Sequence, residues 1–537
     1  MTLLFDVIVI GSGFGGAITA HRLSQAGRKV LLLEQGKRWA KDDFPRTIGR
    51  AAKAFWQEGK SPGFLEYRVF KNMDVIQGVG LGGGSLHYFN VHIRTPAAVM
   101  NQHFPAPITR DVLDPYYDLV QARMESKRLS PPFGKLMPPR TTTFMEAAKA
   151  AGRDPQLLDI AIFTGPDRTN FAGVAQSACV YCGNCLLGCH AQSKNSLDIT
   201  YIAEAERKFG LEVRALHKVS HIAPRMVGEG YEVHFSVLEE HSASAKREGI
   251  LEAKEVIVAA GTLGTNEILL RSRDVACTLP KLGAALGKRF SGNGDFLFAG
   301  AMDVPTVVDP AYAPSISAVA DCSTKEHHIH IEDLGLPDQM LWFLEGALPP
   351  RSNWLKRIWT VLRAYVRRSF RFGTQSSRVS DEIADLLGGA RTAHFLPYLG
   401  MGTDASDGQL LLRGQMLDLN WNHKASLPMF AQMQAAMKSI SIAAGGRYVT
   451  SLLWRWPLKK LLTAHPLGGC VMGSSPETSV VDHRGQVWQY PGLYVADGAS
   501  IPAALSVNPS LTIGAVAERV AFWMIHGRER GPQDNLN

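Results

Sequence analysis

The sequence predicts a mixed fold, in which an α/β part with a largely parallel sheet is joined to an α+β part. Three segments carry this prediction, because each reads as a buried strand, a glycine turn and a helix: residues 5–27, 252–272 and 491–525. Strands that alternate with helices are typical of a parallel sheet covered on both faces. The segments lie far apart in the chain, so the α/β part must be assembled from discontinuous pieces.

The first forty residues contain one complete strand–helix–strand unit. FDVIVIG from Phe5 is an apolar, β-branched strand, residues 11–16 form the turn, and AITAHRLSQAG is a helix that ends at Gly27. KVLLLEQG is the second strand. The later units repeat this order, with a buried strand at Val256–Ala260 and a last helix in NPSLTIGAVAERVAFWMI.

The stretches between these units, roughly 40–190 and 298–455, carry a mixed α+β pattern. We therefore predict a Rossmann-like, dinucleotide-binding domain assembled from discontinuous segments and a substrate-binding domain built on an antiparallel sheet. The first domain comprises 1–40, 72–95, 190–297 and 456–531, and the second comprises 41–71, 96–189 and 298–455.

The composition is that of an ordinary globular protein. The 537 residues correspond to about three or four domain-sized units. Hydrophobic residues make up 45% and charged residues 20%, and no apolar run is long enough to span a membrane. The N-terminus runs directly into the first strand, so we expect no signal peptide and a cytoplasmic location.

The net charge of +8 has a local origin. Between Gly346 and Ser380 there are eight Lys or Arg residues and no acid, so the rest of the chain is balanced. A nucleic-acid-binding protein spreads basic residues over a whole face, so we expect no nucleic-acid partner.

The first glycine turn has the pattern that binds a dinucleotide. Gly11 permits the tight turn, Gly13 lets the backbone approach a pyrophosphate, and Gly16 lets helix and strand pack closely. The helix that follows offers unpaired N–H groups to the phosphates. Glu34 ends the second strand, where its carboxylate can accept hydrogen bonds from ribose hydroxyls.

A second glycine run, GVGLGGGSLH from Gly78 to His87, distinguishes FAD from NAD. It has five glycines in seven residues and lies outside any strand–helix–strand unit. Such a run holds backbone against a flat or phosphorylated ligand, and a flavin needs a second contact because its ring must be clamped as well as its phosphates. The predicted cofactor is therefore FAD.

Several motifs together resemble the glucose–methanol–choline (GMC) oxidoreductases, and within them the cholesterol-oxidase-like branch. They are GSGFGG, GVGLGGGSLHYFN, KNSLDITYI, HPLGGCVMG and DGASIPAALSVNPSLTIGAVAER, which span essentially the whole chain. The resemblance implies FAD, held with or without a covalent bond, a two-domain fold, and oxidation of an alcohol by hydride transfer to the flavin. The predicted cofactor-binding residues are Gly11, Gly13, Gly16, Glu34, Gly78, Gly82, Gly83, Ser85, His87, Asn90, Val219, Asp497, Gly498 and Asn508.

The resemblance also implies the catalytic residues. His465 matches the histidine of HPLGGC that lies over the flavin, and Asn508 matches the asparagine of VNP. A histidine suits removal of the hydroxyl proton, and an amide can orient the oxygen. Without the motif, a packing histidine would be the simpler interpretation of His465.

A third catalytic candidate, Glu332, rests on a shorter match to a glutamate of sterol oxidases. Strand alternation in HHIHIE places His328, His330 and Glu332 on one face. A metal site and an ordinary polar strand face are the alternatives. In an apolar pocket the carboxylate could move a proton between two carbons and shift a double bond.

Four cysteines, Cys179, Cys182, Cys185 and Cys189, have the spacing of a bacterial iron–sulfur ligand run, except that His190 stands where Pro is usual. A cluster that passes electrons to a partner is one interpretation, and buried or zinc-binding thiols are the preferred one. We expect the other three, Cys277, Cys322 and Cys470, to lie in the core.

The basic segment 354–372 has a helical pattern. Its apolar residues recur at helical spacing among basic ones, which suits either a peripheral contact with an anionic membrane or a solvated helix face. The apolar residues are Trp354, Ile358, Val361, Leu362 and Tyr365, and the basic ones are Lys356, Arg357, Arg363, Arg367 and Arg368.

These observations predict an FAD-dependent enzyme that oxidises the CH–OH group of a bulky apolar alcohol. A 3-hydroxysteroid is the leading substrate, with molecular oxygen or another group as electron acceptor. The alternative is a dehydrogenase for a sugar, polyol or long-chain alcohol that passes electrons to a cluster or quinone. A flavin protein without turnover is disfavoured, because His465 and Asn508 both stand in their motifs.

Overall fold

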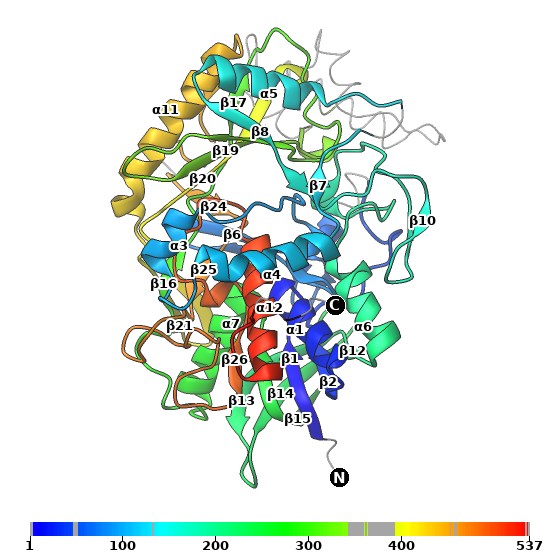
Figure 1. Ribbon diagram of the computed structural model, residues 1–537, viewed down its shortest axis with the longest axis vertical. Coiled ribbons are helices and arrows are strands. Elements are labelled where there is room, and N and C mark those ends of the chain that lie inside the picture. Colours follow the sequence, from blue (N-terminus) through cyan, green and yellow to red (C-terminus); the bar gives the residue numbers. More distant parts are fainter. Residues whose placement is uncertain are drawn as a thin grey trace.

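The computed structural model describes residues 4–46, 52–131, 134–341, 392–451, 453–455 and 459–531, together with residues 359, 362 and 534. Figure 1 shows two sheets stacked along the long axis of the molecule, with β1, β2 and β15 in the lower part and β17, β19 and β20 in the upper part. The prediction of a mixed α/β fold with several sheets is confirmed. The assignment of residue ranges to two domains stays a prediction.

The lower sheet has seven strands around β1 (Leu4–Ile10), whose Val7 to Ile10 are almost completely buried. β1 pairs in parallel with β2 and β15, as the strand–helix–strand pattern predicts. The strand order is β12-β2-β1-β15-β14-β13, and β26 also pairs with β15. The other bounds are β2 (Val30–Leu33), β12 (Glu212–Arg214), β13 (His217–Pro224), β14 (Tyr231–Leu238), β15 (Ala245–Val258) and β26 (Leu493–Val495).

β15 differs from the predicted strand at Val256–Ala260. It begins at Ala245, ends at Val258, and therefore contains fourteen residues. Its first half pairs antiparallel with β14 and is largely exposed, while its second half pairs in parallel with β1 and is buried. Only the buried half has the continuous apolar run by which a parallel strand is found in a sequence.

Helices α1 (Phe14–Gln25), α6 (Tyr201–Phe209) and α12 (Ser510–His526) pack together beside this sheet, and α12 also contacts α4 (Arg110–Arg123). Gly514 makes the close packing of α12 possible. A Cβ atom there would lie 3.1 Å from Ile18 of α1 and 3.2 Å from Val120 of α4, so a larger residue would push the helices apart. Helix α7 (Gly261–Leu270) follows β15 and contacts β13.

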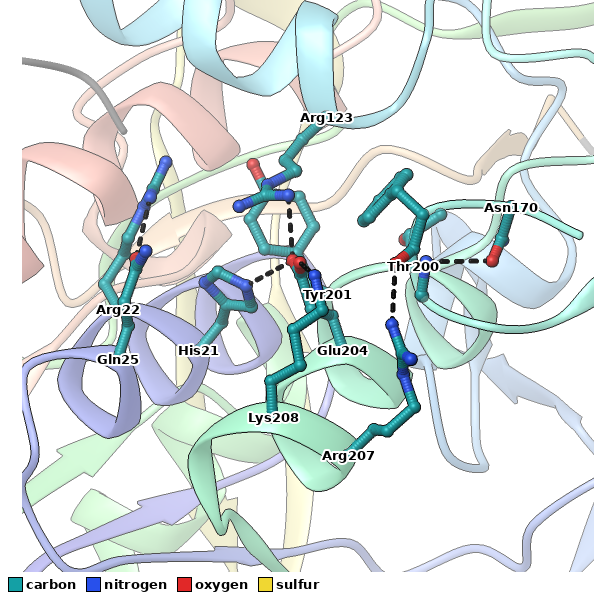
Figure 2. Close-up of polar contacts among 12 residues, drawn as sticks. His21, Arg22, Gln25, Arg123, Asn170, Thr200, Tyr201, Glu204, Arg207 and Lys208 are labelled. Carbon is teal, nitrogen blue, oxygen red and sulfur yellow. Dashed lines mark hydrogen bonds and ion pairs between the residues drawn. The ribbon is translucent and has the colours of Figure 1, made fainter.

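A buried ion cluster also joins α1, α4 and α6 (Figure 2). The carboxylate of Glu204 lies 2.9 Å from His21 Nε2, 2.8 Å from an Arg123 guanidinium nitrogen and 2.8 Å from Lys208 Nζ. Burial opposes ionisation of Glu204, but the hydrogen bonds from His21 and Lys208 and the charge of Arg123 outweigh it and lower its pKa to about 2. One ionised side chain therefore connects three helices.

The upper sheet is antiparallel throughout, with the order β23-β17-β20-β19-β18-β8. α5 (Pro139–Ala150) and α11 (Leu427–Ala443) pack against it and against each other. The bounds are β8 (Asp154–Leu157), β17 (Phe296–Met302), β18 (Ala318–Asp321), β19 (Ile329–Asp333), β20 (Leu396–Gly402) and β23 (Arg447–Val449).

Smaller sheets connect the two large ones, and two of them carry residues of the site. One has the order β24-β6-β5 and the other β22-β21-β16-β25. Their bounds are β5 (Leu65–Val69), β6 (Met73–Gly78), β16 (Lys288–Ser291), β21 (Gly408–Arg413), β22 (Met416–Asn420), β24 (Leu461–Thr463) and β25 (Leu467–Gly469). The remaining helix and short strands are α3 (Ala97–His103), β3 (Trp56–Gln57), β4 (Ser61–Pro62), β7 (Lys127–Arg128), β9 (Asp159–Ile160), β10 (Arg168–Thr169) and β11 (Ala175–Gln176).

The basic segment 354–372 lies outside the described residues, except for Trp359 and Leu362, which are exposed. In the part of the chain that the structure describes, no helix has the length and hydropathy to cross a bilayer.

Candidate active site

One long cavity collects most of the predicted site residues. Its walls come from the first glycine turn, the second glycine run, the start of α7, the loop before β25 and the start of α12. Of the predicted residues, the cavity is lined by Gly11, Gly13, Glu34, Gly78, Gly83, His87, Val219, His465, Asp497, Gly498 and Asn508.

The first glycine turn leaves space where a pyrophosphate is expected. Gly13 has φ −69° and a Cβ atom on it would meet no protein atom within 4 Å. It precedes α1, whose first N–H groups have no partner within the helix and carry its positive dipole end. Gly11, by contrast, has φ +94° and its Cβ would collide with the backbone of Ala259. The two glycines therefore serve different needs, close ligand approach and close backbone packing.

The second glycine run packs directly against the first. A Cβ atom on Gly83 would lie 2.6 Å from the Cα of Gly13. The carboxylate of Glu34 connects the two runs, because it accepts hydrogen bonds from Ser12 N and Oγ at 3.1 and 2.6 Å and from Gly80 N at 3.2 Å. Burial raises the pKa of Glu34. Its predicted contact with a ribose would add to this structural role.

Four predicted cofactor-binding residues and the catalytic candidate Glu332 do not line the cavity; the four are Gly16, Gly82, Ser85 and Asn90. The hydroxyl of Ser85 donates to the carbonyl of Gly82 at 2.7 Å and accepts from Leu197 N at 2.9 Å, so it shapes the glycine run. Asn90 is fully buried with φ +69°, and neither polar atom of its side chain has a partner among the described residues.

His87 lies in the cavity wall and is buried. Burial, together with the positive charge of Lys194, lowers its pKa to about 3, so its imidazole is neutral at physiological pH. Lys194 donates hydrogen bonds to the carbonyls of Leu86, Tyr88 and Cys185 at 2.8, 3.1 and 2.8 Å. It thereby holds the chain on both sides of His87, a role that the sequence analysis missed.

Asp497 fixes the start of α7 next to the cavity. Its carboxylate accepts from Gly261 N at 2.8 Å and from Thr265 Oγ1 at 2.6 Å, and burial raises its pKa to about 6. Gly498 follows it, and a Cβ atom there would lie 2.9 Å from the Thr262 hydroxyl.

His465 lies in the loop between β24 and β25, as the motif predicts. Its main-chain N–H donates to Thr463 Oγ1 at 2.8 Å, and its ring Nδ1 lies 2.9 Å from Oδ1 of Asp295. Among the described residues, no protein group bonds its Nε2, and the ring lines the cavity. Asp295 was missed by the sequence analysis, because no motif links it to a loop 170 residues away.

Asn508 stands just before α12 and its side-chain Nδ2 lies 3.4 Å from Oε2 of Glu332. Glu332, in β19, is completely buried behind Asn508, and burial raises its pKa well above the usual carboxyl range. Within the described ranges, Oδ1 of Asn508 and Oε1 of Glu332 have no partner. Such buried polar atoms are rare unless a ligand or water satisfies them.

The strand-face prediction for HHIHIE holds for His330 and Glu332, which both face the loop before Asn508. His330 Nδ1 donates to the carbonyl of Ser506 at 2.9 Å. No group of three or more His, Cys, Asp or Glu side chains within the described ranges is placed to hold a metal. Neither these residues nor the four clustered cysteines therefore support a metal site.

The cysteines are free thiols, and two of the predictions are wrong. The buried thiols preferred for the cluster are not found, because Cys182 is exposed and Cys179, Cys185 and Cys189 are half-buried. Cys322 and Cys470 are buried, as expected, whereas Cys277 is exposed. It follows the helical segment after α7 with φ +54°, in a turn where hydrophobic character does not imply burial. In the cluster, burial raises the pKa of Cys179, so its thiol is not ionised at neutral pH.

The donor set fits FAD. A pyrophosphate and a flat ring suit the open space at Gly13, the free N–H groups of α1 and the packed glycine runs. The oxygens without a partner among the described residues belong to Asn508, just before α12, and Glu332, in β19. Bound FAD supplies a hydride acceptor. His465 and Asn508, the predicted catalytic residues, both line the cavity.

Comparisons with known proteins agree with this chemistry. Family models described as GMC oxidoreductase match residues 6–286 and 448–517. The chain is 30% identical to a cholesterol oxidase of Acinetobacter baumannii, over 97% of this chain and 94% of that protein. It is 29% identical to a cholesterol oxidase of Mycobacterium tuberculosis (strain ATCC 25618 / H37Rv), over 98% of this chain and 93% of that protein.

A long-chain-alcohol oxidase of Arabidopsis thaliana is 24% identical, over 96% of this chain and 68% of that protein. Among solved structures, a pyridoxine 4-oxidase from Mesorbium loti shares the fold, with a TM-score of 0.62, 16% identity, and coverage of 97% of this chain and 99% of that chain. The chain belongs to the GMC oxidoreductase family and is an FAD-dependent oxidoreductase that acts on alcohols.

Proposed function

We propose that the protein oxidises the hydroxyl group of a 3-hydroxysteroid or a similarly bulky apolar alcohol to a ketone, with molecular oxygen as the electron acceptor. The observation that carries the proposal is the buried carboxyl of Glu332 behind Asn508, which itself lines an apolar cavity. The similarity to cholesterol oxidases at about 30% identity supports the same substrate class.

The cavity has apolar walls that suit such a substrate. Leu297, Leu336 and Leu462 belong to one hydrophobic cluster, Phe298 and Met340 pack against it, and all five line the cavity. Burying apolar surface contributes about 25 cal/mol per Å², so a fused-ring alcohol gains much of its affinity from this wall. His465 and Asn508 then provide the polar groups that select a hydroxyl.

Each polar residue has a distinct task in the proposed reaction. Nε2 of His465 takes the hydroxyl proton, and Oδ1 or Nδ2 of Asn508 orients the substrate oxygen. Glu332 serves a second step, because a carboxylate held in an apolar site can remove a proton from one carbon and return it to another. We therefore include double-bond isomerisation of the ketone in the proposal.

A long-chain primary alcohol is the second candidate substrate, favoured by the similarity to the plant long-chain-alcohol oxidase. We also propose a cytoplasmic location and a peripheral membrane contact through residues 354–372.

A substrate screen on the purified holoenzyme tests the proposal. Without oxygen, a 3-hydroxysteroid should bleach the absorbance of the bound flavin faster than a long-chain alcohol or a sugar does. With oxygen, the reaction should release peroxide. Faster bleaching by the long-chain alcohol would favour the second candidate. Bleaching without peroxide release would indicate an electron acceptor other than oxygen.

A further inference from the structure

Asp295 lies directly behind His465, on the side away from the cavity. It is the last residue of the loop between β16 and β17, and its side chain is completely buried. Three donors surround its carboxylate. Thr463 Oγ1 and Ala464 N lie 2.9 and 3.0 Å from Oδ2, and His465 Nδ1 lies 2.9 Å from Oδ1.

The contacts assign a direction to the hydrogen bond between the two residues. The main-chain N–H of Ala464 can only donate, so Oδ2 must accept. An ionised carboxylate accepts at Oδ1 as well, which requires Nδ1 of His465 to carry the ring proton. With the ring proton on Nδ1, Nε2 is the nitrogen that can accept, and no group among the described residues bonds it.

We propose that Asp295 is the positioning residue of the oxidation, holding His465 in the Nδ1–H tautomer with Nε2 ready to accept the hydroxyl proton. The inference rests on the proposed role of His465. In the step itself the substrate O–H bond breaks and an Nε2–H bond forms. The C–H bond of the carbon that bears the hydroxyl breaks as well, and its hydride would pass to the acceptor that bound FAD supplies. The imidazolium that results faces the carboxylate of Asp295, which stabilises it inside a poorly solvated wall.

The loop that carries Asp295 also supports the second catalytic residue. Asn293 donates from Nδ2 to the carbonyl of Val507 at 2.9 Å, and its Oδ1 accepts from Leu505 N at 2.8 Å. Both contacts fix the chain that leads to Asn508. One short loop, 291–295, therefore positions the groups on both sides of the substrate oxygen.

The loop is in turn held by hydrogen bonds to Asp404, which is buried. Its carboxylate accepts from Ser291 Oγ at 2.8 Å, Gly292 N at 3.1 Å and Gly294 N at 3.0 Å. The position of Asp295 is thus determined by a network of main-chain contacts. That rigidity is what orientation of a proton acceptor requires.

The substitution Asp295→Asn keeps the shape of the side chain but changes which nitrogen of His465 carries the ring proton. The amide has nearly the same shape, but its single oxygen must stay at the Oδ2 site, because Ala464 N–H can only donate there. The NH₂ group then faces Nδ1 and donates to it. The ring proton must move to Nε2, where it blocks acceptance of the hydroxyl proton.

The tautomer is measured by ¹⁵N chemical shifts in protein labelled at histidine, with the His465 signals identified by their loss in His465→Ala. We expect the Nδ1–H pattern in the native protein and the Nε2–H pattern in Asp295→Asn. The matched control is Asp482→Asn, a buried turn aspartate that accepts from Arg484 N and Gln486 N, and it should leave the His465 signals unchanged. An Nε2–H pattern in the native protein overturns the proposal, even if Asp295→Asn fails to fold.

Kinetics then separate a positioning role from a structural one. With whichever alcohol bleaches the native enzyme fastest, Asp295→Asn should lower the anaerobic bleaching rate by about 10³-fold, the range of a lost acid–base group, while flavin content is kept. Added to His465→Ala, it should change the rate by less than about twofold, because residues that act as a unit are not additive. A further large loss in that background overturns the proposal.

Failure of the sterol assignment has a different signature. In that case 3-hydroxysteroids do not bleach the native enzyme, whereas another alcohol does. Bleaching by that alcohol is still slowed by Asp295→Asn, because it requires His465.

Discussion

The side-chain amide of Asn508 faces the carboxyl of Glu332, with Nδ2 3.4 Å from Oε2, although 176 residues separate them in the chain. Each member of the pair keeps an oxygen without a partner among the described residues. Of the two, Asn508 lines the cavity, and Glu332 lies behind it. Burial raises the pKa of Glu332 well above the usual carboxyl range, which favours the neutral form and a neutral hydrogen bond between the two groups.

Glu332→Gln should separate oxidation from isomerisation. The amide fills the same space, so we expect bleaching by a 3-hydroxysteroid within about tenfold of the native rate and loss of the isomerised ketone by more than about 10²-fold. Ultraviolet absorbance of the conjugated product measures the second step. In the native enzyme, isomerisation should become faster as pH rises, because burial raises the pKa of Glu332 and the ionised form is the base. Unchanged isomerisation in the variant would exclude Glu332 from the step.

Gly13→Val should remove the flavin without unfolding the protein. Gly13 has φ −69° and a Cβ there meets no protein atom within 4 Å, so the added side chain projects into the space expected for the pyrophosphate. Absorbance gives the flavin-to-protein ratio, and circular dichroism gives the fold. Gly11→Val is the contrast, because φ +94° and the backbone of Ala259 should make it misfold. A yellow Gly13→Val protein would contradict the assignment of the turn.

His465→Ala should keep the flavin and lower turnover by about two to four orders of magnitude, as for a lost general base. Steady-state peroxide release and anaerobic bleaching both report the loss. His526→Ala provides the control, since this exposed histidine ends α12 and should leave turnover unchanged. Near-native turnover in His465→Ala would place the proton acceptor elsewhere.

The flavin should be released by acid, with no bond to His87. His87 lines the cavity as a neutral ring, because burial and the charge of Lys194 lower its pKa to about 3. We expect acid precipitation to leave a colourless pellet and a yellow supernatant. A yellow pellet that turns white in His87→Ala would establish a covalent link instead.

Glu204 should make the fold sensitive to acid. Its pKa falls from an ordinary 4.5 to about 2 in the folded protein, so its contribution to stability is complete above about pH 4.5 and is lost as pH falls toward 2. Glu204→Gln should lower the free energy of unfolding by about 3 kcal/mol near neutral pH, because it leaves the buried His21 ring and the half-buried Arg123 guanidinium without their ionised acceptor. The difference from the native protein should shrink between pH 4.5 and 2, as urea unfolding would measure.

A neighbouring glutamate is the control for this prediction. Glu206 lies on the same helix but pairs with Arg38 at the surface, so Glu206→Gln should cost less than about 1 kcal/mol at any of these pH values. Equal losses in the two variants would show that burial of the cluster in Figure 2 does not matter.

Elements with a local signal could be predicted from the sequence. Gly11, Gly13 and Gly16 stand in a short turn between an apolar strand and a helix, and Glu34 ends the next strand, so each could be assigned from spacing alone. His465 and Asn508 were found because each lies in a motif of a few residues. These patterns are readable because a turn constrains backbone angles and a buried strand requires a continuous apolar run.

Contacts between distant loops could not be predicted from the sequence. Asp295 contacts His465 across 170 residues, Lys194 holds the chain around His87, and the exposed half of β15 pairs with β14. Cys277, expected in the core, lies at the surface. The residues next to them in the sequence carry no signal of these contacts. The contacts arise because the two large sheets pack together with smaller sheets between them, which brings together loops that are far apart in the chain.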